Sequence, residues 1–140
     1  MMSTEEIKTL ATRMVEEVFN QHDLSGVDKY VSPDFVEHEE LPPGIPPGRE
    51  APRMMFGMLF AAFPDFRATI EQLIAEGDKV VVHMTWTGTQ TGEFMGIPPT
   101  GKRISIQVID IMRFADGQNV EHWGLMDSAK MMQQLGATPG

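Results

Sequence analysis

Cysteine is missing from this chain of 140 residues, and basic residues are few. Without cysteine there is no disulfide framework, thiolate nucleophile or cysteine-ligated metal site. Eleven lysines and arginines stand against 20 aspartates and glutamates, which gives a formal net charge of -9. This charge repels phosphate backbones and anionic lipid, so neither nucleic acid nor a membrane is expected as a partner.

Long apolar runs are absent too, and none approaches the roughly 20 residues that cross a bilayer. The first residues, MMSTEEIKTL, carry acids early and lack the basic and apolar segments of a signal peptide. We therefore expect a cytoplasmic protein. The length fits one ordinary domain, and no internal repeat or long linker divides the chain, so residues 1–140 are predicted to form a single domain.

Hydrophobic spacing predicts helices first and strands afterwards. Ser3 and Glu6 have the spacing of a capping box, and Asp127 is placed to cap a last short helix. The expected helices are 4–20, 24–31, 50–63 and 128–135, and the expected strands are 35–38, 67–74, 79–87, 104–114 and 119–126. This order predicts an α+β fold, a curved antiparallel sheet with three N-terminal helices on its concave face and a short C-terminal helix.

The turn at residues 115–117, Ala-Asp-Gly, decides which side chains of the last hairpin meet. A three-residue loop with glycine in the left-handed position would pair Phe114 with Gln118. Counting back then sets Asp110 opposite His122, with β-carbons about 5 Å apart. Asp110 could accept a hydrogen bond from one ring nitrogen and leave the other for a ligand, as in an oriented general base. A two-residue turn would break this pairing.

Apolar residues surround this predicted pair on the same sheet face, among them Val108 and Met112. The pair would therefore sit in a dry place, where its members titrate together. The alternative is that Asp110 and His122 satisfy each other as a polar pair in the core, without catalysis.

Several further residues are candidates for contacting a ligand. His38 closes a short strand beside the proline-rich loop and either rims a cavity or faces solvent. Trp86 either stacks on a flat ligand or fills the core. Met58, in a helix that is apolar almost all round, belongs to a set of twelve methionines that line an adaptable cavity or act as core filler. With Val108 and Met112, these residues form the predicted substrate-binding set.

No metal and no cofactor are suggested by the sequence. The four histidines show no metal-binding spacing, and the glycines between residues 88 and 101 lie between strands and do not form a phosphate loop. Asp127 is interpreted first as a helix cap, and His22 and His83 as structural residues.

Four motifs together resemble the SnoaL-like polyketide cyclase family, in its ester cyclase branch, within the nuclear-transport-factor-2-like superfold. They are TGEFMGIPPTGKR at 91–103, IDIMRFADG at 109–117, VEHWGLMD at 120–127 and QQLG at 133–136. The resemblance covers nearly the whole chain. It implies a cone-shaped, strongly bent sheet closed by helices around an apolar pocket, and a homodimer formed through the sheet.

The resemblance also implies a cofactor-free intramolecular aldol condensation, in which a base removes a proton from a polyketide ester and the enolate closes a ring. Better-understood members use an aspartate on the last strand, with a histidine on the strand before it. Those two positions are Gly124 and Asp110 here, so a relocated pair, Asp110 and His122, would have to replace them.

Three functions remain open. The first is a cyclase, isomerase or lyase acting on a small apolar carbonyl compound, with His122 as base, Asp110 as its orienter and His38 as a second polar contact. The second is a non-catalytic small-molecule-binding or dimerisation module, which Gly124 favours. The third is an epoxide-hydrolase-like enzyme in which Asp110 activates water.

Overall fold

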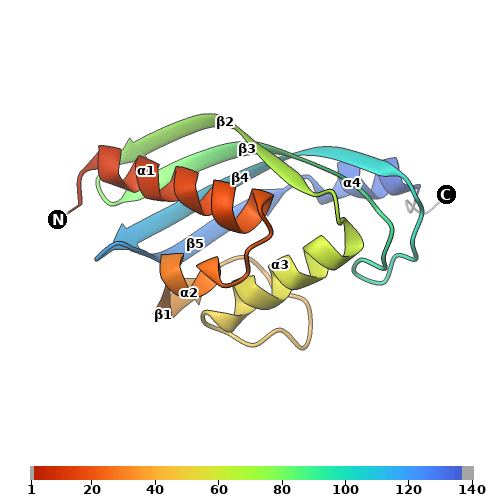
Figure 1. The fold of residues 1–140 in the computed structure, drawn as a ribbon, viewed down its shortest axis with the longest axis horizontal. Helices are drawn as coiled ribbons and strands as arrows, with labels where there is room; N and C mark the ends of the chain where they lie inside the picture. Colours follow the sequence, from red (N-terminus) through yellow and green to blue (C-terminus); the bar gives the residue numbers. More distant parts are fainter. Residues whose placement is uncertain (1, 137–140) are drawn as a thin grey trace.

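Three helices lie across one face of a five-stranded sheet in the computed structural model, which describes residues 2–136 (Figure 1). The helices are α1 (Thr4–Met14), continued by a wider π-helical segment, η1 (Val15–Asn20), then α2 (Gly26–Tyr30), α3 (Glu50–Ala62) and α4 (Ser128–Leu135). The strands are β1 (Val31–Glu37), β2 (Arg67–Glu76), β3 (Lys79–Thr89), β4 (Arg103–Ala115) and β5 (Gln118–Met126). The predicted α+β class, with a curved sheet and N-terminal helices on one face, is confirmed.

The strands follow the order β1-β5-β4-β3-β2. All neighbours are antiparallel except β1 and β5, which pair in parallel. The prediction of an antiparallel sheet is therefore wrong for this one pair of strands. β1 and β5 are far apart in the chain, so no hairpin turn fixes their relative direction. β1 also begins at Val31, earlier than expected, because an edge strand tolerates the proline at position 33.

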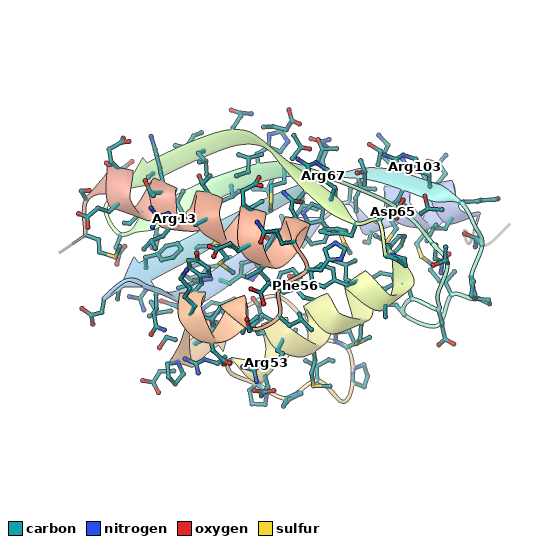
Figure 2. All side chains as sticks on the ribbon, viewed as in Figure 1. Arg13, Arg53, Phe56, Asp65, Arg67 and Arg103 are labelled. Carbon is teal, nitrogen blue, oxygen red and sulfur yellow. The ribbon has the colours of Figure 1, made fainter. Side chains whose placement is uncertain are left out.

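Alternation along the strands divides the sheet into an inner and an outer face. On β3, Val80, Val82 and Met84 are buried beneath the helices. The helical side contributes Ile7 and Val18, and the capping box between Ser3 and Glu6 is present as predicted. Figure 2 shows Phe56 of α3 pointing into the layer between helices and sheet, and its ring lies 4.6 Å from that of Phe19.

The glycine- and proline-rich loop between β3 and β4 is folded around one buried amide. Gln90 is fully buried; its side chain donates to the carbonyl of Ile97 at 3.0 Å and accepts from the hydroxyl of Thr100 at 2.8 Å. These bonds hold Phe94 against Phe63, with ring centroids 5.4 Å apart. The loop thereby closes one end of the space between the helices and the sheet.

Within residues 2–136, no helix combines the length and the apolar character needed to cross a bilayer.

At the far end of the sheet, α4 is held to β4 by Gln134, whose side-chain amide bonds both backbone groups of Ser105 at 2.8 and 2.9 Å. The fold thus leaves one sheet face covered by α1, α2 and α3 and the other largely uncovered (Figure 1).

Candidate active site

The β4–β5 hairpin turns through two residues, not three. Asp116 and Gly117 both have positive φ, 51° and 80°, and Ala115 pairs directly with Gln118. An Asp-Gly dipeptide favours this type of two-residue turn because its twist matches that of the flanking strands. The predicted pairing of Phe114 with Gln118 is therefore wrong.

A β-bulge next to the turn brings Asp110 and His122 back to the same face. Phe114 pairs with Asn119 and Arg113 with Glu121, so Val120 is the extra residue. Since a one-residue shift reverses every side chain beyond it, a two-residue turn alone would have separated the pair. Turn and bulge together leave the register two residues from the predicted one, with Asp110 opposite Gly124.

His122 reaches Asp110 diagonally, across the position of Gly124. Its Nε2 lies 2.8 Å from Oδ1 of Asp110. A β-carbon on Gly124 would lie 2.7 Å from Cε1 of His122 and 2.8 Å from Oδ1 of Asp110. The hydrogen bond therefore depends on the missing side chain at position 124, the place where the family resemblance implied an aspartate.

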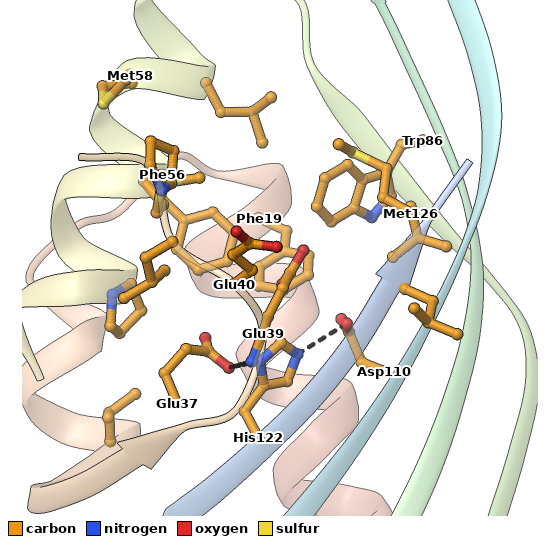
Figure 3. A pocket seen from close by; sticks show the side chains of 18 of the residues that line it. Phe19, Glu37, Glu39, Glu40, Phe56, Met58, Trp86, Asp110, His122 and Met126 are labelled. Carbon is orange, nitrogen blue, oxygen red and sulfur yellow. Dashed lines mark hydrogen bonds and ion pairs between the residues drawn. The ribbon is translucent and has the colours of Figure 1, made fainter. Parts of the chain in front are cut away.

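Glu37, the last residue of β1, holds the other ring nitrogen of His122. Its Oε2 lies 2.5 Å from Nδ1, and Figure 3 shows the ring between the two carboxylates. The parallel β1–β5 pairing sets Glu37 beside His122. Neither ring nitrogen is left for a ligand, in contrast to the arrangement expected from the sequence.

The two carboxylates keep His122 charged. Burial alone would lower the pKa of the imidazole, but the hydrogen bonds to Asp110 and Glu37, together with their negative charges, raise it to about 10. At neutral pH both ring nitrogens therefore carry protons and donate to the flanking carboxylates. His122 is an imidazolium that orients Asp110, and it is not free to act as a base.

The Asp110 carboxylate opens onto a cavity of about 610 Å³ between the sheet and α3. Trp86, Val108, Met112 and Met58, predicted to contact a ligand, all line it. The wall is mainly apolar, contributed by η1, β1, α3, the sheet and the loop that carries Phe94. Apart from Asp110 and the polar residues near it, this wall offers a ligand few hydrogen-bonding groups.

The structure does not bring His38 into this cavity. Its ring stacks on Trp123, 4.6 Å between centroids, and its Nε2 lies 2.7 Å from Glu121. Both partners belong to the outer sheet face. Alternation along β1 explains the placement: the buried Phe35 and the half-buried Glu37 face inward, so the next residue faces outward.

Two further acids, Glu39 and Glu40, line the cavity where the chain leaves β1. Both residues are exposed, so they mark the mouth. Partial burial of the carboxyl group, with repulsion from Glu37 and Asp110, raises the pKa of Glu39 to about 7, against the opposing charge of His122. Glu39 therefore exchanges its proton near neutral pH.

Glu37, Glu39 and His122 place potential metal-ligand atoms within 4.8 Å of one another. A cation would need Nδ1 of His122 without its proton. The raised pKa of His122 and its bond to Glu37 oppose this. The residues are better suited to holding protons than a metal ion.

The remaining candidates have structural roles. Asp127 caps α4 by accepting a hydrogen bond from the backbone of Lys130 at 3.1 Å, as predicted. His22 bonds the carbonyl of Phe66 at 2.9 Å. His83 lies between Gln72 and Gln107 on the outer face, and its Nε2 is 2.6 Å from Gln107.

Three residues of the site were missed by sequence reasoning: Glu37, Glu39 and Asn119. The signal for Glu37 was present, because its spacing from Phe35 places both on the inner face. Asn119, 1% exposed, faces the cavity in place of Val120 because the two-residue turn pairs it with the buried Phe114. The Asp-Gly dipeptide is the signal for this two-residue turn.

Comparison with known proteins identifies the family of the chain. The model of the SnoaL-like polyketide cyclase family matches residues 9–135. Nogalonic acid methyl ester cyclase of Streptomyces nogalater is 31% identical over 120 residues, covering 84% of this chain and 89% of that protein.

Two solved structures extend the likeness to nearly the whole chain. TsrD from Streptomyces laurentii superposes with a TM-score of 0.89 at 30% identity, covering 99% of this chain and 100% of that one. AclR from Streptomyces galilaeus gives a TM-score of 0.84 at 35% identity, covering 99% and 89%. The chain belongs to the SnoaL-like polyketide cyclase family.

Proposed function

We propose that this protein closes a ring in a neutral polyketide ester by a cofactor-independent intramolecular aldol reaction, with Asp110 as the base. The observation that carries the proposal is the row Glu37, His122, Asp110 in the wall of an otherwise apolar cavity. Membership of a cyclase family and the likeness to a methyl ester cyclase support the same reaction type.

Asp110 has the placement a base needs. Only its Oδ1 is hydrogen-bonded to another residue in the described part of the chain, which leaves Oδ2 for a substrate C–H. Asp110 removes the proton from carbon, the enolate carbon attacks a ketone carbonyl of the same molecule, and the carbonyl oxygen takes up a proton. The fixed charge of His122 lies in a poorly hydrated wall, where it stabilises negative charge better than water would.

The charge at the cavity favours an ester over a free acid. Glu37 and Asp110 are only partly offset by the single imidazolium, and Glu39 and Glu40 add negative charge at the mouth. A substrate carboxylate would be repelled by these groups and would lose its hydration against the apolar wall. A methyl ester carries neither penalty.

The test uses nogalonic acid methyl ester, the compound in the name of the related cyclase, and its free acid as a matched probe. With purified protein and no added cofactor, we expect the ester to convert to a cyclic isomer of unchanged mass, detected by chromatography with mass spectrometry. The free acid should bind more weakly. Tight binding of the ester without conversion would instead support the non-catalytic binding module.

We also propose that two copies of the chain associate through the outer sheet face. Ile74, Val81, Ile111 and Trp123 are successive register partners, so they form an apolar row across four strands. Beside this row, Ile109 is 46% exposed and its partner Leu125 is 80% exposed. A continuous apolar surface of this kind is typical of a protein interface.

Replacing Leu125 with Glu should convert a dimer to a monomer, because a charge would be buried in the proposed contact. Light scattering after size-exclusion chromatography measures the mass directly. Arg13→Glu, on the exposed side of α1, is the control and should leave the mass unchanged. A wild-type protein that runs as a monomer at all concentrations would refute the contact.

A further inference from the structure

We infer that Glu39 is the acid of the ring-closing reaction and protonates the alkoxide that forms when the enolate attacks the carbonyl. The substrate then binds with its acidic C–H toward Asp110 and its electrophilic carbonyl toward the mouth of the cavity. This inference rests on the proposed cyclase function and adds the second proton-transfer group and the orientation of the substrate.

The placement of Glu39 is the first support. The residue lines the cavity, and a carboxylate oxygen lies within 4.8 Å of the ligand atoms of Glu37 and His122. Its backbone N–H donates to Oε2 of Glu37 at 3.3 Å, which fixes the chain over the row of charged groups. Figure 3 shows the Glu39 side chain reaching into the cavity beyond the His122 ring.

The lack of a partner is the second support. In residues 2–136, Glu37 and Asp110 both bind His122, whereas the Glu39 carboxyl makes no hydrogen bond or ion pair with a protein group. It therefore remains available to a ligand, and its carboxylate is the one that lies within 4.8 Å of the ligand atoms of Glu37 and His122 in the described residues. Its exposure at the mouth also gives it access to bulk water.

The charged surroundings explain why Glu39 can hold a proton to give. Glu37 from β1 and Asp110 from β4 repel a charge on Glu39, and His122 from β5 attracts it. Glu40 lies beside it on the same loop. With partial burial as the largest cause, these groups place the pKa of Glu39 at about 7, so a proton is present below that pH and is readily lost.

The protons balance over one turnover. Asp110 takes the proton from carbon, the new carbon–carbon bond converts the carbonyl oxygen to an alkoxide, and Glu39 gives its proton to that oxygen. Asp110 is then protonated and Glu39 ionised. Asp110 loses its proton to water and Glu39 regains one from water, which restores both groups without any oxidant or reductant.

The two half-reactions can be measured separately with nogalonic acid methyl ester in D₂O. Exchange of the acidic C–H for deuterium reports proton removal by Asp110, and formation of the cyclic isomer reports closure. In Glu39→Gln we expect exchange to continue while closure falls by about 10²-fold, the usual contribution of a general acid. A structural role for Glu39 would lower both rates together, and that result would overturn the inference.

The pH dependence gives a second readout. Because the protonated form of Glu39 is needed, wild-type closure should fall as pH rises through about 7, the pKa of Glu39. Glu39→Gln should lose this fall. Glu40→Gln, the neighbouring acid at the mouth, should keep it. If the fall persists in Glu39→Gln, another group is the acid. If the wild type shows neither exchange nor closure, the proposed cyclase function itself fails.

Discussion

Replacing Asp110 with Asn should reduce kcat/KM for ring closure by about 10²–10⁴-fold, the range for loss of a positioned proton-transfer group. The amide cannot take a proton from carbon. It is nearly the same size, and its oxygen can still accept the hydrogen bond that Nε2 of His122 now donates to Oδ1 at 2.8 Å. Steady-state kinetics and deuterium exchange, measured on the same sample, report the effect.

Asp116→Asn is the matched control for this substitution. Asp116 lies in the turn of the same hairpin, exposed and outside the cavity lining, and asparagine tolerates its φ of 51°. The control should keep wild-type exchange and closure. Full activity in Asp110→Asn would show that the base lies elsewhere in the cavity.

Replacing Gly124 with Ala should have a comparable effect, although the new methyl group carries no chemistry. It would lie 2.7–2.9 Å from Cε1 and Nε2 of His122 and Oδ1 of Asp110, closer than real contacts allow. The hydrogen bond must lengthen or break. We expect closure to fall by about 10²-fold, the pKa of His122 to drop, and stability to fall by about 1–3 kcal/mol from overpacking.

Gly57→Ala provides the comparison for the Gly124 variant. A β-carbon there meets only Cδ1 of Leu24, at an ordinary 3.7 Å. Activity and the pKa of His122 should not change in this control. An active Gly124→Ala protein with an undisturbed His122 would mean that the pair does not depend on the space at position 124.

The same geometry explains how this chain departs from the pattern implied by its family resemblance. With an aspartate at position 124, the ring of His122 could not lie across that position. Here the carboxylate stands at Asp110 on β4 and the imidazole at His122 on β5. The charged pair thus remains on the inner wall while its members occupy different places.

Most of the fold could be predicted from the sequence because its signals are local. The capping box at Ser3, the cap at Asp127 and the alternation along β3 and β4 each depend on residues close in the chain. The parallel pairing of β1 with β5 could not be predicted in this way, because only the packed fold brings these two strands together.

The main residues of the candidate site could be predicted from the sequence, but their relative positions were predicted less well. Asp110 and His122 were found through hairpin pairing, but the turn has two residues and a bulge at Val120 compensates for it. Such a bulge adds a residue without any marked change in composition. Glu37 was overlooked in favour of His38, and its contact with His122 reverses the expected roles of imidazole and carboxylate.

Nitrogen NMR of the His122 ring between pH 6 and pH 11 tests most directly whether an imidazole that is charged at neutral pH holds Asp110 as the base. We expect both ring nitrogens to stay protonated through neutral pH, with a midpoint near the pKa of about 10. Asp110→Asn and Glu37→Gln should each lower that midpoint. A midpoint near the ordinary value of about 6.5, or one bare ring nitrogen at pH 8, would contradict the assignment.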